Sequence, residues 1–202
     1  MRRGSGAFLH GGGWGIGPSR RAIPTLTEAG WALDVVVYGE GEAPAEPGTH
    51  RYHRIAPSWR PWRRDESGEL GYPPLETMSP EHGPVFVPQP GRTLFDVIEA
   101  ARVIVSKPGG STLIDSLAAA TPIAFLEPYG PAEAANARLW TRLGGGLDFA
   151  TWAEHRYSAE ALESLHATLA RMRRDTPLYL PVFAAASEGE RTAGLAGSRG
   201  CP

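Results

Sequence analysis

The sequence predicts an α/β fold, a doubly wound parallel sheet with helices on both faces. The runs at 33–39 and 102–106 are mostly apolar and rich in β-branched residues, which is typical of strands buried on both faces. Helical patterns alternate with such runs along the chain. Because crossovers between parallel strands are right-handed, the loops that follow the strands meet at one edge of the sheet, where ligands bind in this fold class.

The composition favours one globular domain. The chain has 202 residues, of which 42% are hydrophobic, enough for one sizeable core. A formal net charge of -2 gives no overall basic field, so we expect small or neutral ligands rather than nucleic acid or an anionic membrane. No apolar run approaches the roughly 18 residues of a membrane helix and no secretory signal is evident, so we expect a cytoplasmic protein. The single cysteine, Cys201, excludes an internal disulfide and a multi-cysteine metal site.

The first predicted unit is a strand, a glycine loop, a helix and a second strand. The apolar residues 7–9 lead into HGGGWGIGP at 10–18, and a helical pattern runs from there to a stop at Gly30. The apolar run at 33–39 then supplies the second strand. Together these segments predict a βαβ unit.

Residues 40–84 are predicted to form a long irregular loop. The segment has no hydrophobic periodicity and is rich in Pro, Gly, Arg and Trp, with an Arg/Trp-rich part at 51–64. Loops of this length in a compact domain are either functional or disordered. The Arg/Trp-rich part therefore fits a phosphate site, a partner surface or a solvated loop without a role.

Regular structure is predicted again after position 84. The expected strands are 85–87, 102–106 and 122–128, and the expected helices are 94–101, 112–120, 132–143 and 159–174. We expect one domain over 7–183, preceded by a short extension at 1–6 and followed by a disordered tail at 184–202.

Two glycine-rich segments, GGGWGIG and PGGST, fall where a strand gives way to a helix. Unpaired helix N–H groups and the positive end of the helix dipole favour an anion there, and glycines let a phosphate approach the backbone. Two such loops indicate a diphosphate or a nucleotide, although a tight turn explains many glycine runs. Neither loop has the spacing of a dinucleotide-binding motif or a P-loop. A nicotinamide enzyme stays an alternative, because Glu40 follows the second strand where a ribose-binding acid is found.

The segment RVIVSKPGGSTLIDSLAAATPIAFLEPYGPAEAANARLWTRLGGG carries a longer pattern: a strand, a glycine turn, a small-residue helix, a strand and a further helix. Its marked positions are Gly109, Gly110, Thr112, Asp115, Pro122, Glu133 and Asn136. This pattern resembles the nucleotide-sugar-binding core of family 28 glycosyltransferases, the group of the lipid II-forming N-acetylglucosaminyltransferase and monogalactosyldiacylglycerol synthase. GGGWGIGP also resembles the opening loop of that family's C-terminal domain. The resemblance extends over 7–149 and implies a Rossmann-like half-domain of the GT-B type.

The resemblance implies a set of site residues. Backbone N–H groups of both loops would hold the diphosphate of a nucleotide-sugar, with a uridine diphosphate sugar as substrate, no resident cofactor and no metal, and Asp115 would accept hydrogen bonds from the ribose. The implied diphosphate residues are Gly12, Gly13, Trp14, Gly15, Gly109, Gly110, Ser111 and Thr112, and the implied base residues are Gln89, Pro90, Arg92 and Leu94. Glu133 and Asn136 correspond to sugar contacts. The family often has Gln where this chain has Glu133, whose carboxylate only accepts hydrogen bonds, so the identity of the sugar stays open.

In that family the general base and the acceptor pocket lie in a preceding domain. We therefore expect the donor-binding part of a hexosyltransferase-type enzyme that needs a separate acceptor-binding partner protein. One alternative is a self-contained small glycosyltransferase or nucleotide-sugar-processing enzyme, with the long loop replacing the other domain and His10 or His53 as the base. Another is a non-catalytic nucleotide-sugar-binding or scaffold protein. His10 also fits a packed residue at a strand end, because one unpartnered histidine is weak support for acid-base chemistry.

Overall fold

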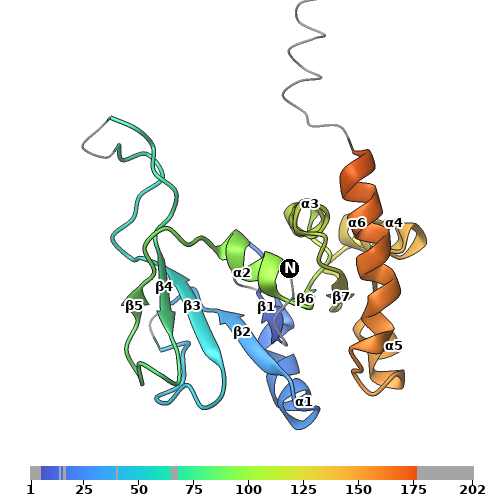
Figure 1. Ribbon diagram of the computed structural model, residues 1–202, viewed down its shortest axis with the longest axis horizontal. Helices are drawn as coiled ribbons and strands as arrows, with labels where there is room; N and C mark the ends of the chain where they lie inside the picture. The colour runs from blue at the N-terminus through green and yellow to red at the C-terminus, as the bar shows by residue number, and fades with distance from the viewer. Residues whose placement is uncertain (1–5, 14, 16, 40, 65–67, 177–202) are drawn as a thin grey trace, which may run out of the picture.

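The protein forms an eight-stranded sheet in the order β5-β4-β3-β2-β1-β6-β7-β8 (Figure 1). The computed structural model describes residues 6–13, 15, 17–39, 41–64 and 68–176. The strands are β1 (Gly6–Leu9), β2 (Ala32–Val36), β3 (Arg51–Ile55), β4 (Leu75–Met78), β5 (Val87–Pro88), β6 (Val103–Ser106), β7 (Ile123–Phe125) and β8 (Gly146–Asp148). Neighbours from β3 through β1 to β8 pair in parallel, whereas β4 pairs antiparallel with both β3 and β5. The parallel part has the doubly wound strand order, which confirms the predicted fold class.

Helices cover both faces of this sheet. The helices are α1 (Ile23–Glu28), α2 (Leu94–Ala100), α3 (Gly110–Ala119), α4 (Pro131–Leu143), α5 (Phe149–Glu154) and α6 (Glu163–Asp175), with 3₁₀ turns at Pro18–Ala22 and Glu160–Leu162. Ala7 and Leu9 of β1 belong to one core cluster with residues of α1 and α5. Phe8, which points to the opposite face, belongs to a second cluster with residues of α2, α3, α4 and α6. Alternate residues of β1 therefore anchor two separate layers of helices.

The start of α2 is fixed by a capping box. The backbone N–H of Thr93 donates to the Asp96 carboxylate at 2.6 Å, and the Asp96 N–H donates to the Thr93 hydroxyl at 3.4 Å. These bonds satisfy backbone groups that the first turn of a helix leaves unpaired. They hold Leu94 and Phe95 at the end of the helix that faces the site described below.

The irregular loop expected at 40–84 contains two strands, β3 and β4, so that part of the prediction is wrong. β3 does not form an apolar run, because Arg51 and His53 in this strand are hydrogen-bonded to Asp34 of β2. The Asp34 carboxylate accepts two hydrogen bonds from Arg51, each of 2.7 Å, and one from His53 of 2.8 Å. The other ring nitrogen of His53 lies 2.9 Å from the Thr77 hydroxyl of β4. A largely buried polar network thus joins three strands, and the polar residues 51, 53 and 77 interrupt the apolar pattern from which β3 and β4 would have been predicted.

The glycine run at 144–146 does more than end a helix. Gly144 terminates α4 in the left-handed region, with a φ of 75°, as a helix-ending glycine does. Gly146 begins β8, which the sequence did not predict, and a Cβ there would lie 2.6 Å from the Ile123 carbonyl oxygen. Only glycine lets β8 approach β7 this closely. The short helix α5 follows directly and was also missed.

The remaining boundaries shift by a few residues. The strand expected at 85–87 is β5 at Val87–Pro88, and the helix expected at 159–174 is a 3₁₀ turn followed by α6. Of the expected extension at 1–6, only Gly6 is described, and it begins β1. The tail expected at 184–202 lies outside the described residues. Of the described helices, none is both long and apolar enough to cross a lipid bilayer.

Candidate functional site

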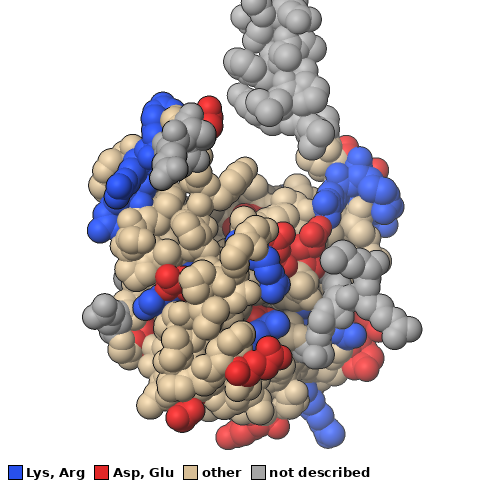
Figure 2. Space-filling view, turned by 60° about the vertical axis from the view of Figure 1, so that its left-hand side comes forward, with Lys and Arg blue, Asp and Glu red and all other residues tan. Residues whose placement is uncertain are grey.

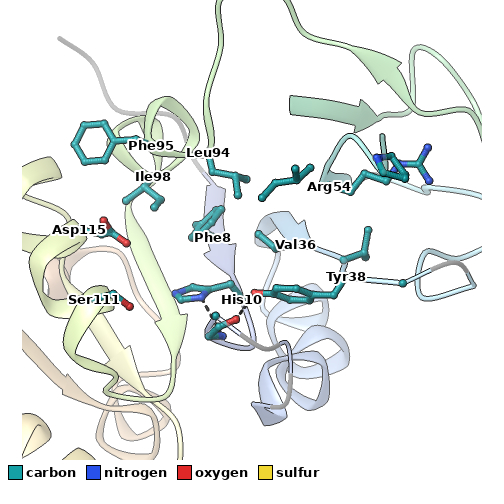
Figure 3. A pocket seen from close by; sticks show the side chains of 16 residues that line it. Phe8, His10, Val36, Tyr38, Arg54, Leu94, Phe95, Ile98, Ser111 and Asp115 are labelled. Atoms are coloured by element: carbon teal, nitrogen blue, oxygen red, sulfur yellow. Dashed lines mark hydrogen bonds between the residues drawn. The ribbon is translucent and has the colours of Figure 1, made fainter. Parts of the chain in front are cut away.

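A cavity of about 610 Å³ opens at the carboxyl ends of β1, β2 and β3 (Figure 3). Its walls come from these three strands and the loops after them, from α2 and from the first turns of α3. The chain leaves β1 for β2 on one side and returns to β6 on the other, so the cavity lies where the strand order reverses. Ligands bind at this position in open α/β sheets.

The cavity has a polar end and an apolar wall. Ser111 and Asp115 of α3 point toward His10, which follows β1 (Figure 3). Leu94 and Ile98 of α2 lie above them, beside Phe8, and the wall continues through Val36, Ile55 and Pro57. A small number of polar groups on a largely apolar surface is typical of sites for organic ligands.

Most of the described amides of the first glycine loop are engaged within the loop. The N–H of Gly12 donates to Nδ1 of His10 at 3.1 Å. The N–H of Gly15 donates to the Gly12 carbonyl at 3.1 Å, and that of Gly17 donates to the Gly11 carbonyl at 2.9 Å. Gly13 is exposed and lines the cavity. Trp14, implied as a diphosphate contact, lies outside the described residues.

Close packing accounts for the glycines of this loop. A Cβ on Gly11 would lie 2.7 Å from the Gly15 carbonyl group, and one on Gly15 would lie 2.6 Å from the Tyr38 ring. Gly15 also has a φ of 68°, which L side chains rarely adopt. The compact turn therefore requires these glycines, whether or not the loop binds a ligand.

The second glycine loop leads into the N-terminus of α3, which borders the cavity. Gly109, in the extended conformation, precedes α3, and no side chain within the described part of the chain caps this helix end. The N–H of Gly109 itself donates to the Lys107 carbonyl at 2.8 Å. The N–H groups of Gly110, Ser111 and Thr112 belong to the first turn and have no partner within the helix. Ser111 lines the cavity, whereas Thr112 is buried and does not line it.

Asp115 stands one turn further along α3 and faces the cavity (Figure 3). It is partly buried, and burial raises its pKa above the usual value. Among the described residues, no side chain forms an ion pair with it. The carboxylate can therefore accept hydrogen bonds from a ligand at the polar end of the cavity.

His10 is a neutral hydrogen-bond donor in this arrangement. Burial, and secondarily the charge of Lys107, lowers its pKa to about 4. Because Nδ1 accepts the Gly12 N–H, the single proton of the neutral ring is on Nε2. The ring packs against Phe8, with centroids 5.5 Å apart.

Tyr38, which follows β2, was not singled out from the sequence. Its hydroxyl donates to the Gly12 carbonyl at 2.6 Å, and its ring packs on Gly15. Burial, the main cause, raises its pKa to about 12. An aromatic residue directly after a buried strand, at the same edge as the glycine loop, was the signal that could have identified it.

Glu133 and Asn136 contact the second glycine loop and do not line the cavity. The Lys107 ammonium forms an ion pair with Glu133, and the Asn136 side chain donates to the Pro108 carbonyl at 3.0 Å. Burial opposes ionisation of Glu133, but hydrogen bonds from Lys107 and from the Tyr129 N–H outweigh it, so the pKa of Glu133 lies below its usual value. Lys107 directly precedes the glycine turn of the second loop, and no role was predicted for it from the sequence.

The implied base residues are divided between two cavities. Leu94 lines the main cavity, whereas Gln89, Pro90 and Arg92 line a second one of about 480 Å³ beside Tyr72. The structure thus brings His10, Gly12, Gly13, Ser111, Asp115 and Leu94 together and leaves those three residues apart. Within the described ranges, no group of three or more His, Cys, Asp or Glu side chains could hold a metal ion.

The Arg/Trp-rich part lies mostly outside the main cavity. Arg54 of β3 lines it, but its guanidinium is paired with Glu76 at 2.7 Å and lies 4.1 Å from the centroid of the Phe86 ring. Arg60, Arg63 and Arg64 are exposed on the segment between β3 and β4, where Figure 2 shows a basic group at the surface. Trp62 is 76% exposed in the same segment.

The mostly parallel sheet and its two helix layers have the fold of one half of GT-B glycosyltransferases. The chain is similar to the glycosyltransferase of kitacinnamycin, with 18% identity and a TM-score of 0.53 over 86% of this chain and 39% of that one. It is similar to the glycosyltransferase SsfS6 from Streptomyces sp. SF2575, solved with thymidine diphosphate, with 16% identity and a TM-score of 0.54 over 88% and 39%. For the spinosyn rhamnosyltransferase SpnG the identity is 16% and the TM-score 0.52 over 86% and 42%.

The chain spans about two fifths of the length of these structures. At these identities the likeness concerns the fold, and it does not single out family 28. No protein-family model matches the chain, and no curated protein matches it.

Proposed function

We propose that this chain is the donor-binding half of a glycosyltransferase and binds a nucleotide-sugar in the main cavity. The observation that carries the proposal is the convergence of three groups at one polar end: the unpaired amides of α3, the Nε2–H of His10 and the carboxylate of Asp115. Anion donors and a diol acceptor on neighbouring elements are the requirements of a nucleoside diphosphate.

The diphosphate is assigned to the start of α3. Amides of Gly110, Ser111 and Thr112 can donate to phosphate oxygens, and the positive end of the helix dipole stabilises the charge. His10 adds a neutral donor, its Nε2–H, and its Nδ1 lone pair already accepts the Gly12 N–H and is not available to take a proton. We therefore assign to it a role in holding the phosphate rather than in general base catalysis.

The ribose is assigned to Asp115. A partly buried carboxylate without a cation partner is costly to keep ionised, and two hydroxyl donors of a ribose offset that cost. The base then lies against the apolar wall of Phe8, Val36 and Leu94. A pyrimidine fits the proposal, with uridine diphosphate as the expected nucleotide.

The same groups supply the chemistry of transfer. When the sugar leaves for an acceptor, negative charge accumulates on the departing diphosphate, where the amides and helix dipole of α3 stabilise it without a metal ion. The acceptor pocket and the general base are assigned to polypeptide outside this domain. His53 is not that base, because both its ring nitrogens are engaged and it is buried.

Thermal unfolding with nucleotides tests the proposal. We expect uridine diphosphate at about 100 times its Kd to add about 2.7 kcal/mol and raise the melting temperature by about 5–10 °C. Asp115→Asn is expected to abolish this shift without lowering the melting temperature of the free protein, because it removes an unpaired carboxylate. Asp148→Asn, an exposed acid at the end of β8, is the matched control and should keep the shift.

The outcomes separate the alternatives. A shift with NAD but not with uridine or thymidine diphosphate would indicate a nicotinamide enzyme. Turnover of a uridine diphosphate sugar by the chain alone would indicate a self-contained enzyme. No shift with any of these compounds would overturn the proposal and leave a scaffold role.

A further inference from the structure

Lys107 is the only lysine of the sequence, and it lies between the two glycine loops. It follows β6 directly, and a Cβ on Gly12 would lie 2.8 Å from its Cε atom. Its ammonium pairs with Glu133 at the start of α4 and lies 5.1 Å from the centroid of the Tyr129 ring. The side chains of Lys107 and Glu133 are 15% and 18% exposed, so the pair is mostly sheltered but within reach of solvent.

The polar end of the main cavity, where the diphosphate is proposed to bind, has little positive charge. His10 is neutral there, and the guanidinium of Arg54 is already paired with Glu76. In the first loop the amides of Gly12 and Gly15 are engaged in hydrogen bonds. A helix N-terminus supplies roughly half an elementary charge, which is less than a diphosphate carries. A further cation is needed to balance the charge of a bound diphosphate.

We propose that Lys107 is that cation, and that its ammonium leaves Glu133 to contact the diphosphate when the nucleotide binds. This inference rests on the proposed function. A lysine can change partners in this way because its ammonium is a point charge on a flexible stem. An arginine is less suited, because its planar guanidinium forms hydrogen bonds only in fixed directions. In the free protein, the Lys107 ammonium and the Glu133 carboxylate neutralise each other in an ion pair.

Glu133 is held in place independently of Lys107. Its second carboxylate oxygen accepts the Tyr129 N–H at 2.8 Å, a bond that the departure of the ammonium does not break. The oxygen that Lys107 releases then becomes a free acceptor beside the second glycine loop. A hydroxyl of the donor sugar is the group that it accepts, so one exchange of partners couples diphosphate binding to sugar binding.

Calorimetric titration of the full chain with uridine diphosphate and with uridine tests the exchange. Lys107→Met is expected to weaken uridine diphosphate binding by about tenfold or more, the range of a hydrogen bond to a charged group, and to leave uridine binding unchanged. Glu133→Gln is expected to strengthen uridine diphosphate binding by about two- to fivefold, because the ammonium no longer has to leave a carboxylate. Arg138→Met, which removes one exposed positive charge from α4, is the matched control and should change neither affinity.

A second measurement uses the wild-type protein. Reductive ¹³C-methylation yields one side-chain signal besides the α-amino group, because the sequence has one lysine. We expect uridine diphosphate to shift that signal and uridine to leave it in place.

An unshifted signal, or equal loss of both ligands in Lys107→Met, would show that the lysine only supports the fold and would overturn the inference alone. If the wild type binds neither uridine diphosphate nor uridine, the proposed function fails and this inference fails with it.

Discussion

The hydroxyl of Tyr38 donates to the Gly12 carbonyl at 2.6 Å and so ties the end of β2 to the glycine loop after β1. Both residues line the main cavity. The loop therefore takes its position partly from a neighbouring strand.

Tyr38→Phe is expected to loosen this loop. Loss of one intramolecular hydrogen bond costs about 1 kcal/mol, so the melting temperature should fall by about 2–4 °C, and uridine diphosphate should bind about fivefold more weakly. Thermal unfolding and calorimetric titration measure the two effects. An unchanged affinity would mean that the bond supports stability without shaping the site.

Gly15→Ala should destabilise the fold more than Gly13→Ala. Gly15 has a φ of 68°, and its Cβ would lie 2.6 Å from the Tyr38 ring, whereas a Cβ on Gly13 would meet no atom within 4 Å. We expect a loss of about 1–3 kcal/mol for Gly15→Ala and a change within about 0.5 kcal/mol for Gly13→Ala. Urea denaturation of the two variants side by side gives the comparison, and equal stabilities would contradict the packing argument.

The stability of the protein should depend on pH through His10. The pKa of His10 is 6.5 in the unfolded chain and about 4 in the folded protein. Between these values the unfolded chain binds the proton and the folded protein does not, so this contribution to stability is present above pH 6.5 and falls as the pH is lowered toward 4.

His10→Gln isolates this contribution, because its amide can still accept the Gly12 N–H but does not titrate. The free energy of unfolding of the variant, measured in urea at pH 7.5 and pH 5, should fall less than that of the wild type. Parallel losses in both proteins would refute the assignment to His10.

Asp34→Asn should cost about 2–3 kcal/mol at neutral pH. The side chain of Asp34 is 4% exposed and accepts hydrogen bonds from both Arg51 and His53, and an amide cannot accept from both equally well. Burial opposes ionisation of Asp34, but the hydrogen bonds from His53 and Arg51 outweigh it and lower the pKa below 3.8.

This stability is present above pH 3.8 and is lost as the pH falls through the folded pKa. The difference in unfolding free energy between wild type and Asp34→Asn should therefore shrink below about pH 4. Urea denaturation over a pH series measures it, with Asp148→Asn as the exposed control. A constant difference down to pH 2 would argue against the ionised carboxylate as its source.

The parts of the fold that depend on apolar burial were predictable from the sequence. Apart from Asp34 of β2 and Ser106 of β6, the buried positions of β1, β2 and β6 are apolar because helices cover both faces of the sheet, and α3 follows its strand after a glycine turn. β3 was not predictable, because His53 takes a buried position that an apolar residue usually fills and is satisfied by Asp34, 19 residues earlier. β8 has only three residues, too few to set a pattern.

The candidate site was predictable where it depends on local geometry. Ser111 and Asp115 occupy the first turns of one helix, so the motif alone places them at the same end of the sheet. Tyr38 and Lys107 act through contacts with residues far along the chain, Gly12 and Glu133, and no spacing rule reveals such pairs. The internal hydrogen bonds of the first glycine loop are local, but they depend on the exact backbone conformation of the loop, which a glycine-rich sequence does not specify.

Pro88 ends the ladder of backbone hydrogen bonds at one border of the sheet. It belongs to β5, the outermost strand, and has no N–H to offer to an incoming strand. A second polypeptide cannot continue the ladder through that position, which protects this border against unwanted self-association.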